Sequence, residues 1–106
     1  MAIDVKAILG ELRRELAALY GERLRGLYLF GSYARGEADA ESDLDVAVVL
    51  DRVERYGEEV DRVGGLVSRL SLEHDVSILP VFVSEEAWRT DDSLLLVNAR
   101  QDAIPA

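Results

Sequence analysis

The sequence predicts an α+β fold, a small mixed β-sheet with its helices mainly on one face. Segments with apolar residues at helical spacing interleave with short β-branched apolar runs, in the order α-β-turn-β-α-β-α. The chain has 106 residues, of which 49% are hydrophobic. We therefore expect one core and a single domain over residues 1–106.

The first half of the chain is expected to hold a long helix and two strands. Apolar residues between Val5 and Tyr20 recur every three or four positions, and Gly21 suits a helix end. The run 43–50 is apolar at nearly every position and β-branched, as a central strand would be. The expected elements are a helix over 4–20, a strand over 24–30, a helical turn with Ser32 near its N-cap, a polar loop over 35–42 and a strand over 43–50.

The second half is expected to hold three helices and a strand. Pro80 cannot donate to a β-ladder, so it should bend or break its strand, and the glycine pair should weaken or kink the helix that contains it. Trp88 is interpreted as a core anchor, and the acidic cluster around Glu58 and Glu59 as a solvated helix face. The expected elements are a helix over 52–72 containing Gly64 and Gly65, a strand over 75–83, a short helix capped by Ser84 through Trp88, and a helix from Asp92 or Ser93 to about Gln101.

Charge and composition exclude several classes of protein. The net charge is −9 and Lys6 is the only lysine, so a nucleic-acid partner is not expected. There is no cysteine, which excludes disulfides and thiolate metal sites. No apolar run is long enough to span a membrane, and the N-terminus does not have the pattern of a signal peptide. A cytoplasmic protein without membrane contact is expected.

Two carboxylates lie one residue apart at the start of the strand over 43–50. Side chains alternate along a strand, so Asp43 and Asp45 point to the same side as Ala47 and Val49, which we call the carboxylate face. An isolated Asp-x-Asp pair is more often a solvated strand entrance. Unpaired like charges at this spacing repel each other, however, and a divalent cation would remove the conflict.

The strand over 75–83 supplies a third acidic residue. If this strand pairs beside 43–50 with its apolar face on the same helices, Asp75 lies on the carboxylate face. Mg²⁺ prefers carboxylate oxygens, water and substrate phosphates, and a pair of such ions can stabilise the attacking and leaving oxygens of a phosphoryl displacement. The spacing therefore predicts a metal site at Asp43, Asp45 and Asp75, with two Mg²⁺ ions as the expected number.

A phosphate-binding turn is expected just before the carboxylates in the sequence. Gly31 allows close backbone approach to a phosphate, and Ser32 adds a hydroxyl at the start of a helical turn, whose free amides favour anions. Together with the acids, this turn suggests a metal-phosphate site.

The stretch "GSYARGEADAESDLDVAVV" resembles the signature of the nucleotidyltransferase superfamily related to DNA polymerase β. The pattern is Gly-Ser, Arg-Gly, a short loop, Ser-Asp-x-Asp and a third acid on a later strand. The small size of the chain and its "ARG" form are similar to the minimal nucleotidyltransferases, the MNT proteins, which commonly pair with HEPN-domain proteins as antitoxins. The resemblance implies the polymerase β-like nucleotidyltransferase fold and spans nearly the whole chain.

The resemblance also implies roles for individual residues. Gly31 and Ser32 would hold the triphosphate of ATP or another NTP, and Asp43 and Asp45 would bind the Mg²⁺ that bridges it. Asp75 would complete a metal site and help to deprotonate an acceptor hydroxyl. Arg35 would either contact phosphate or brace its loop against Glu37, Asp39 or Glu41, and these alternatives stay open.

The expected function is Mg²⁺-dependent transfer of a nucleoside monophosphate to an acceptor hydroxyl on a HEPN partner. The favoured group is AMP, with ATP as its donor. The alternatives are a non-catalytic nucleotide-binding or interaction module that neutralises its partner by complex formation, and a subunit that modifies a small molecule. Ala47, Val49 and Leu79 would leave apolar surface on the carboxylate face, so a partner subunit or a homodimer is expected to complete the pocket.

Overall fold

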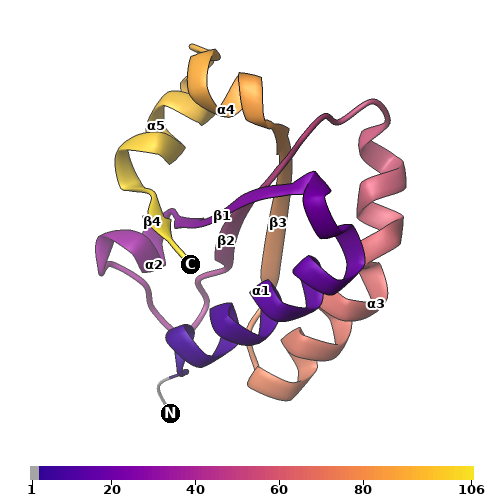
Figure 1. The fold of residues 1–106 in the computed structure, drawn as a ribbon. Coiled ribbons are helices and arrows are strands. Elements are labelled where there is room, and N and C mark those ends of the chain that lie inside the picture. The colour runs from indigo at the N-terminus through magenta and orange to yellow at the C-terminus, as the bar shows by residue number, and fades with distance from the viewer. Residues whose placement is uncertain (1–2) are drawn as a thin grey trace.

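The computed structural model describes residues 3–106, in which helices and strands alternate as the periodicity predicts (Figure 1). The expectation that the N-terminus does not have the pattern of a signal peptide rests partly on residues 1 and 2, which lie outside the described residues. The elements are α1 (Val5–Tyr20), a single 3₁₀ turn (Gly21–Arg23), β1 (Leu24–Phe30), α2 (Ser32–Arg35), β2 (Leu44–Leu50), α3 (Tyr56–His74), β3 (Ile78–Ser84), α4 (Glu85–Thr90), α5 (Leu94–Asp102) and β4 (Ile104–Pro105).

The four strands form one mixed sheet in the order β3-β2-β1-β4. β2 pairs antiparallel with β1 and parallel with β3, while β4 pairs antiparallel with β1. The register places Phe30 opposite Asp45 on one side of β2 and Leu79 beside Asp45 on the other. The C-terminal end of β1 and the N-terminal end of β2 therefore meet at one end of the sheet, where the Gly-Ser turn and the carboxylates lie.

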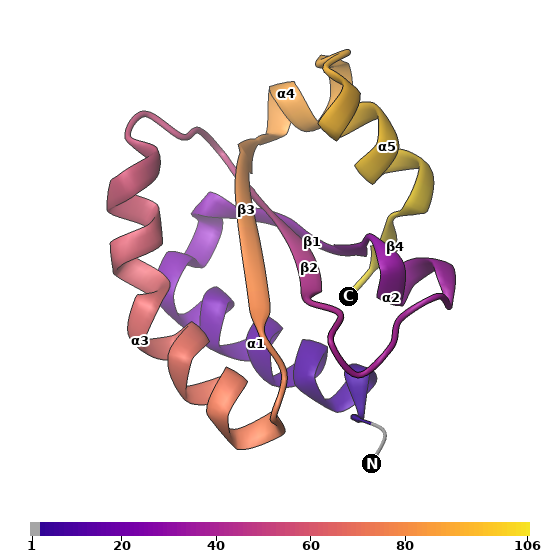
Figure 2. The ribbon, with the colours of Figure 1, turned by 180° about the vertical axis from the view of Figure 1, so that it is seen from behind.

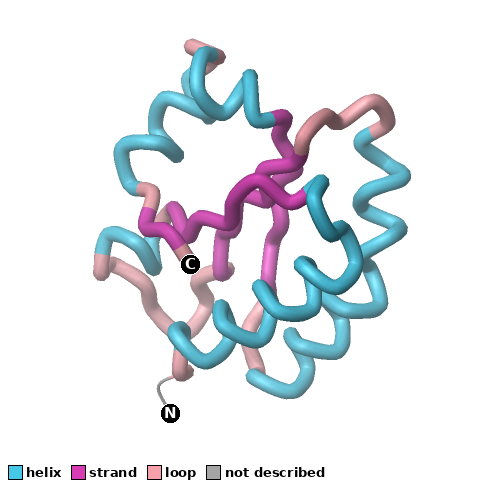
Figure 3. Tube along the Cα trace, viewed as in Figure 1, coloured by secondary structure: helices cyan, strands magenta, loops and turns pink. Residues whose placement is uncertain are grey.

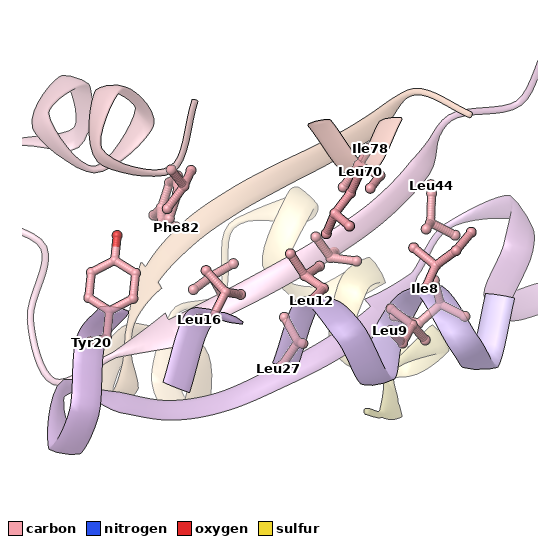
Figure 4. Packing of buried hydrophobic residues seen from close by; sticks show 14 of the residues in the cluster. Ile8, Leu9, Leu12, Leu16, Tyr20, Leu27, Leu44, Leu70, Ile78 and Phe82 are labelled. Atoms are coloured by element: carbon pink, nitrogen blue, oxygen red, sulfur yellow. The ribbon is translucent and has the colours of Figure 1, made fainter. Parts of the chain in front are cut away.

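The two long helices cover one face of the sheet, where the larger core lies. Figures 1 and 2 show α1 and α3 beside each other on this side. In the close view, side chains of α1 such as Leu12 and Leu16 point toward the sheet (Figure 4). Leu44, Val46 and Val48 of β2 are fully buried in this cluster, so the predicted division of the strand between its two faces is confirmed.

The short helices α4 and α5 cover part of the opposite, carboxylate face. The tube in Figure 3 shows them as a separate helical segment beyond the sheet. Ala47 and Val49 are buried against Trp88 and Leu96, so the expectation that they would be left uncovered is wrong. Leu79 does remain exposed, at 46%. The prediction of an α+β fold with a small mixed sheet is confirmed, with this second, smaller helical layer added.

The starts of α4 and α5 have the predicted capping chemistry, and the cap of α1 was not predicted. The Asp4 side chain accepts from the amide of Ala7 at 3.1 Å, and the Ser84 hydroxyl accepts from the amide of Ala87 at 3.1 Å. Ser93 caps α5. At α2, by contrast, Gly31 rather than Ser32 occupies the capping position.

Other boundaries differ from the prediction for physical reasons. α3 starts at Tyr56 instead of 52 and continues through both internal glycines. β3 starts three residues later than predicted, because Asp75 ends α3 in the left-handed conformation. Pro80 is accommodated within β3 because this is an edge strand, paired on one side only.

Glu59 contradicts the prediction of a solvated acidic face. Its side chain is buried, with the residue only 5% exposed, and it accepts a hydrogen bond from the Tyr20 hydroxyl at 2.9 Å. Arg62 at 2.9 Å and Arg23 at 3.2 Å pair with its two carboxylate oxygens. Its neighbour Glu58 is exposed as predicted.

Within residues 3–106, no helix combines the length and the apolar character that crossing a membrane requires.

Candidate active site

The turn between β1 and α2 requires glycine for two independent reasons. Gly31 has φ +77°, a conformation that side chains with a Cβ rarely adopt. A Cβ at this position would also collide with the carboxylate of Asp45. The backbone of the turn and the Asp45 carboxylate are therefore in direct contact, and nothing larger than a hydrogen fits between them.

The two predicted carboxylates lie together at the entrance to β2. Asp43 is exposed and Asp45 is partly buried. Burial first, and then the charge of Asp43, raise the pKa of Asp45 above its ordinary value of 3.8, while Arg35 opposes the shift. The predicted repulsion between the pair is thus present in the structure, and a bound cation would relieve it.

A cavity of about 340 Å³ lies between α5 and the turn at Gly31 and Ser32, which we call the phosphate turn after its predicted role. Gly31, Ser32 and Asp45 form one side of it, and residues of α5 form the other. In Figures 1 and 2 the C-terminal part of α5 descends beside α2, which brings the two sides together. The residues that line the cavity are Phe30, Gly31, Ser32, Arg35, Asp45, Leu95, Asn98, Ala99 and Asp102.

Arg35 is held by two carboxylates. Its Nε lies 3.1 Å from Glu37, which was one of the bracing partners proposed from the sequence. Its Nη1 lies 2.7 Å from Asp102 at the end of α5, a contact that the sequence did not suggest. Arg35 therefore connects the loop after α2 to the last helix, and it also lines the cavity.

Asp75 lies apart from the carboxylate pair. It ends α3 with φ 53°, before β3 begins, and lines a separate cavity of about 460 Å³ together with Tyr33 and Asp39. Among residues 3–106, Asp43, Asp45 and Asp75 do not form a group whose ligand atoms all lie within 4.8 Å of one another. In this arrangement Asp75 would have to move to share an ion with the pair, so its role as a metal ligand stays a prediction.

Comparison with known proteins identifies the family. The nucleotidyltransferase domain family matches residues 9–99. The chain belongs to this family. It is 32% identical over 79 residues to the Methanocaldococcus jannaschii protein named "Putative protein adenylyltransferase MJ0141", covering 74% of this chain and 79% of that protein. It is 37% identical over 78 residues to "Putative protein adenylyltransferase MJ0604" from the same organism, covering 74% and 72%.

A solved structure shares the fold. The structure described as "the toxin-antitoxin with AMP-PNP" superimposes with a TM-score of 0.67 at 20% sequence identity, covering 96% of this chain and 72% of that chain. The resemblance to nucleotidyltransferases and the expectation of a nucleotidyl-transferring enzyme are thus confirmed.

The residues of this nucleotidyltransferase that sequence reasoning missed belong to α5. Positions 95, 98, 99 and 102 have helical spacing, so a shared face could have been predicted from the sequence. Nothing in the sequence indicated that this face would lie opposite the phosphate turn, because that depends on how α4 and α5 fold back over the sheet.

A second group of possible metal ligands lies far along the chain from this site. Glu11, Glu73 and His74 bring their ligand atoms within 4.8 Å of one another. Arg69 already pairs with Glu73 at 3.3 Å and with Glu11 at 3.5 Å. Its guanidinium supplies the positive charge that an ion would bring, so the group is explained as an ion-pair network between α1 and α3.

Proposed function

We propose that this nucleotidyltransferase transfers AMP from ATP to a hydroxyl group on a partner protein. The observation that carries the proposal is the contact between the Gly31 turn and the Asp45 carboxylate at the edge of one cavity. A turn that admits a phosphate closely and a carboxylate that favours a cation are there held side by side. The names of the two Methanocaldococcus jannaschii relatives support protein as the acceptor and adenylyl as the group transferred.

The reaction is an in-line displacement at phosphorus. The oxygen of the acceptor hydroxyl forms a bond to the α-phosphorus of ATP while the bond to the oxygen bridging to the β-phosphate breaks. Pyrophosphate leaves with that electron pair, and the hydroxyl proton passes to a base. The turn at Gly31 and the hydroxyl of Ser32 orient the triphosphate, so catalysis comes mainly from positioning.

Asp43 and Asp45 are the residues that would hold Mg²⁺. Their chemistry fits this ion, because the two adjacent carboxylates provide hard oxygen ligands, and burial followed by the charge of Asp43 raises the pKa of Asp45. When bound, Mg²⁺ would neutralise charge on the triphosphate and stabilise the attacking and leaving oxygens. Arg35 lines the same cavity and would have to leave Glu37 or Asp102 in order to contact the phosphates.

A HEPN-domain toxin is the partner that we propose as acceptor. The sequence resembles MNT antitoxins in its central motif, and a structure with the same fold is described as "the toxin-antitoxin with AMP-PNP". The exposed Asp43 and the exposed Leu79 leave the outer side of the carboxylate face accessible to such a partner.

Labelled ATP tests the proposal directly. The chain is incubated with Mg²⁺, α-labelled ATP and the protein encoded beside it, and the label on that protein is counted after denaturing electrophoresis. We expect transfer with the wild type and none with Asp43→Asn/Asp45→Asn, while Glu41→Gln on the same exposed loop should transfer normally. Label on no protein substrate would contradict the proposal.

One observation favours a second candidate, a nucleotide-binding module that neutralises its partner without chemistry. Asp75 lies outside the carboxylate group, so the chain brings two acids together instead of three. The same Asp43→Asn/Asp45→Asn variant separates the two functions in a growth-rescue assay with the partner. If it rescues growth as well as the wild type does, complex formation is the mechanism; if rescue is lost while the complex still forms, catalysis is the mechanism.

A further inference from the structure

The side of the cavity opposite the phosphate turn is built by one face of α5. Leu95, Asn98 and Ala99 lie at helical spacing and line the cavity together. Ala99 is buried, Leu95 is 56% exposed, and Asn98 is exposed. An apolar surface and one amide therefore face the place where a nucleotide held at Gly31 would extend.

α5 is fixed in position, so its face can act as a selective surface. Leu96 and Ala99 anchor it in the core that also contains Trp88. Arg100 donates to the backbone carbonyl of Trp88 at 2.9 Å and to that of Asp91 at 2.6 Å. Two residues further on, at the same C-terminal end of α5, Asp102 pairs with Arg35 at 2.7 Å.

The Asn98 amide is available to a ligand. The side-chain hydrogen bonds formed by α5 and its cap involve Ser93, Arg100 and Asp102. Within residues 3–106, no hydrogen bond uses the side chain of Asn98. Since the packing of α5 does not depend on this amide, its donor and its acceptor can both serve a bound molecule.

An amide suits adenine better than guanine. Adenine presents a donor at N6 beside an acceptor at N7, which an Asn side chain can match with two hydrogen bonds. Guanine presents two acceptors at O6 and N7, so one of the two contacts would bring acceptor against acceptor. The carboxylate that could instead accept from guanine N1 and N2 is Asp102, and Arg35 already occupies it.

We propose that Asn98 and Leu95 form the base subsite of this nucleotide site and that Asn98 selects adenine. The inference rests on the proposed function, because it places the phosphates at Gly31 and Ser32. Leu95 packs on the face of the base, and Asn98 reads its edge. The adenylyl preference then comes from α5, a helix outside the motif that resembles the superfamily signature.

Comparison of two nucleotides that differ in their base, in the absence of any acceptor protein, tests the inference. Binding of AMP-PNP and GMP-PNP to the full chain is measured by titration calorimetry with Mg²⁺. The wild type should prefer AMP-PNP by roughly 5- to 150-fold, the range expected for one bidentate amide contact. Asn98→Ala should bring the two affinities to within about threefold, and Leu95→Ala should weaken both analogues while keeping the preference.

Gln101→Ala provides the matched control, because Gln101 is an exposed amide on the same helix and does not line the cavity. It should keep the wild-type preference. If the wild type binds both analogues equally, or if Asn98→Ala keeps the full preference, the base subsite is wrong while the proposed function stands. If the wild type binds neither analogue, both fail. All the changed positions are exposed, and circular dichroism checks the fold of each variant.

Discussion

Gly31 is the residue on which the site most depends. Replacing it with alanine combines an unfavourable backbone conformation with a collision against Asp45. Gly36 has a similar φ of +72°, but nothing lies within 4 Å of the position of its missing Cβ. The two glycines therefore separate the cost of conformation from the cost of close approach.

We expect Gly31→Ala to lose nucleotide binding and Gly36→Ala to retain it. Both should lose about 1–2 kcal/mol of stability from the left-handed conformation, and Gly31→Ala should lose more because Asp45 must also move. Urea unfolding measures the stability, and AMP-PNP titration measures the binding. Equal binding by the two variants would show that the contact with Asp45 is not needed.

Asp45 should lower the stability of the metal-free protein. Its folded-state pKa is raised above 3.8, so the folded state holds this proton more tightly than the unfolded chain does. The contribution of the protonated Asp45 to the free energy of unfolding is therefore complete at low pH. It is lost as the pH rises from 3.8 through the folded-state pKa. At neutral pH the ionised carboxylate is a net cost.

Asp45→Asn should consequently raise the melting temperature at pH 7 in the absence of Mg²⁺ while abolishing transfer. The difference from wild type should shrink as the pH approaches 3 and both side chains become neutral. Added Mg²⁺ should stabilise the wild type more than the variant, because the ion binds the folded state through this carboxylate. Scanning calorimetry from pH 3 to 7 provides the measurement; a less stable variant at pH 7 would contradict the argument.

At the scale of elements, α4 and α5 depend on Arg100. This side chain joins the two helices by hydrogen bonds to the carbonyls of Trp88 and Asp91. Because one of these bonds is exposed, Arg100→Ala should cost about 1–2 kcal/mol, while Arg89→Ala, an exposed arginine on α4, should cost less than about 0.5 kcal/mol.

Amide hydrogen exchange should locate the effect of Arg100→Ala. Protection should fall in α5 before it falls in α1 or α3, because the long helices belong to the other core cluster. Nucleotide affinity should fall as well, since the face that carries Asn98 would no longer be held. Uniform loss of protection across the chain would contradict a separate role for this layer.

The elements themselves were predictable wherever one local signal determined them. The helical periodicity of α1 and the Ser84 and Ser93 caps of α4 and α5 were readable from neighbouring residues. β4 was not, because a two-residue strand ending in proline exists only through its pairing with β1. Glu59 was misjudged for the same reason, since its partners Tyr20 and Arg23 lie far away in the sequence.

At the scale of the whole molecule, the charge of −9 predicts that a polyanion is not a partner. We expect no measurable binding to single- or double-stranded DNA or RNA at about 50 mM salt, because too few free cations are available to displace counterions. Fluorescence anisotropy with labelled oligonucleotides checks this. Binding that weakens steeply with added salt would reveal a basic surface that the composition does not suggest.

The site was predictable to the extent that it lies in one continuous stretch. Gly31, Ser32, Asp43 and Asp45 are close in sequence, and the β1–β2 register brings them together at one end of the sheet. Asp75 and α5 depend instead on long-range folding. The left-handed end of α3 kept Asp75 out of the strand, and the return of α5 brought Asn98 in.

Pro80 in the edge strand β3 bears on how a partner can approach. An exposed strand edge offers a row of backbone donors and acceptors with which a neighbouring chain can extend the sheet. Pro80 directly follows Leu79, the residue that pairs with Asp45, and it interrupts that row of donors. A strand of the acceptor protein proposed above would therefore find no continuous row of donors at this edge.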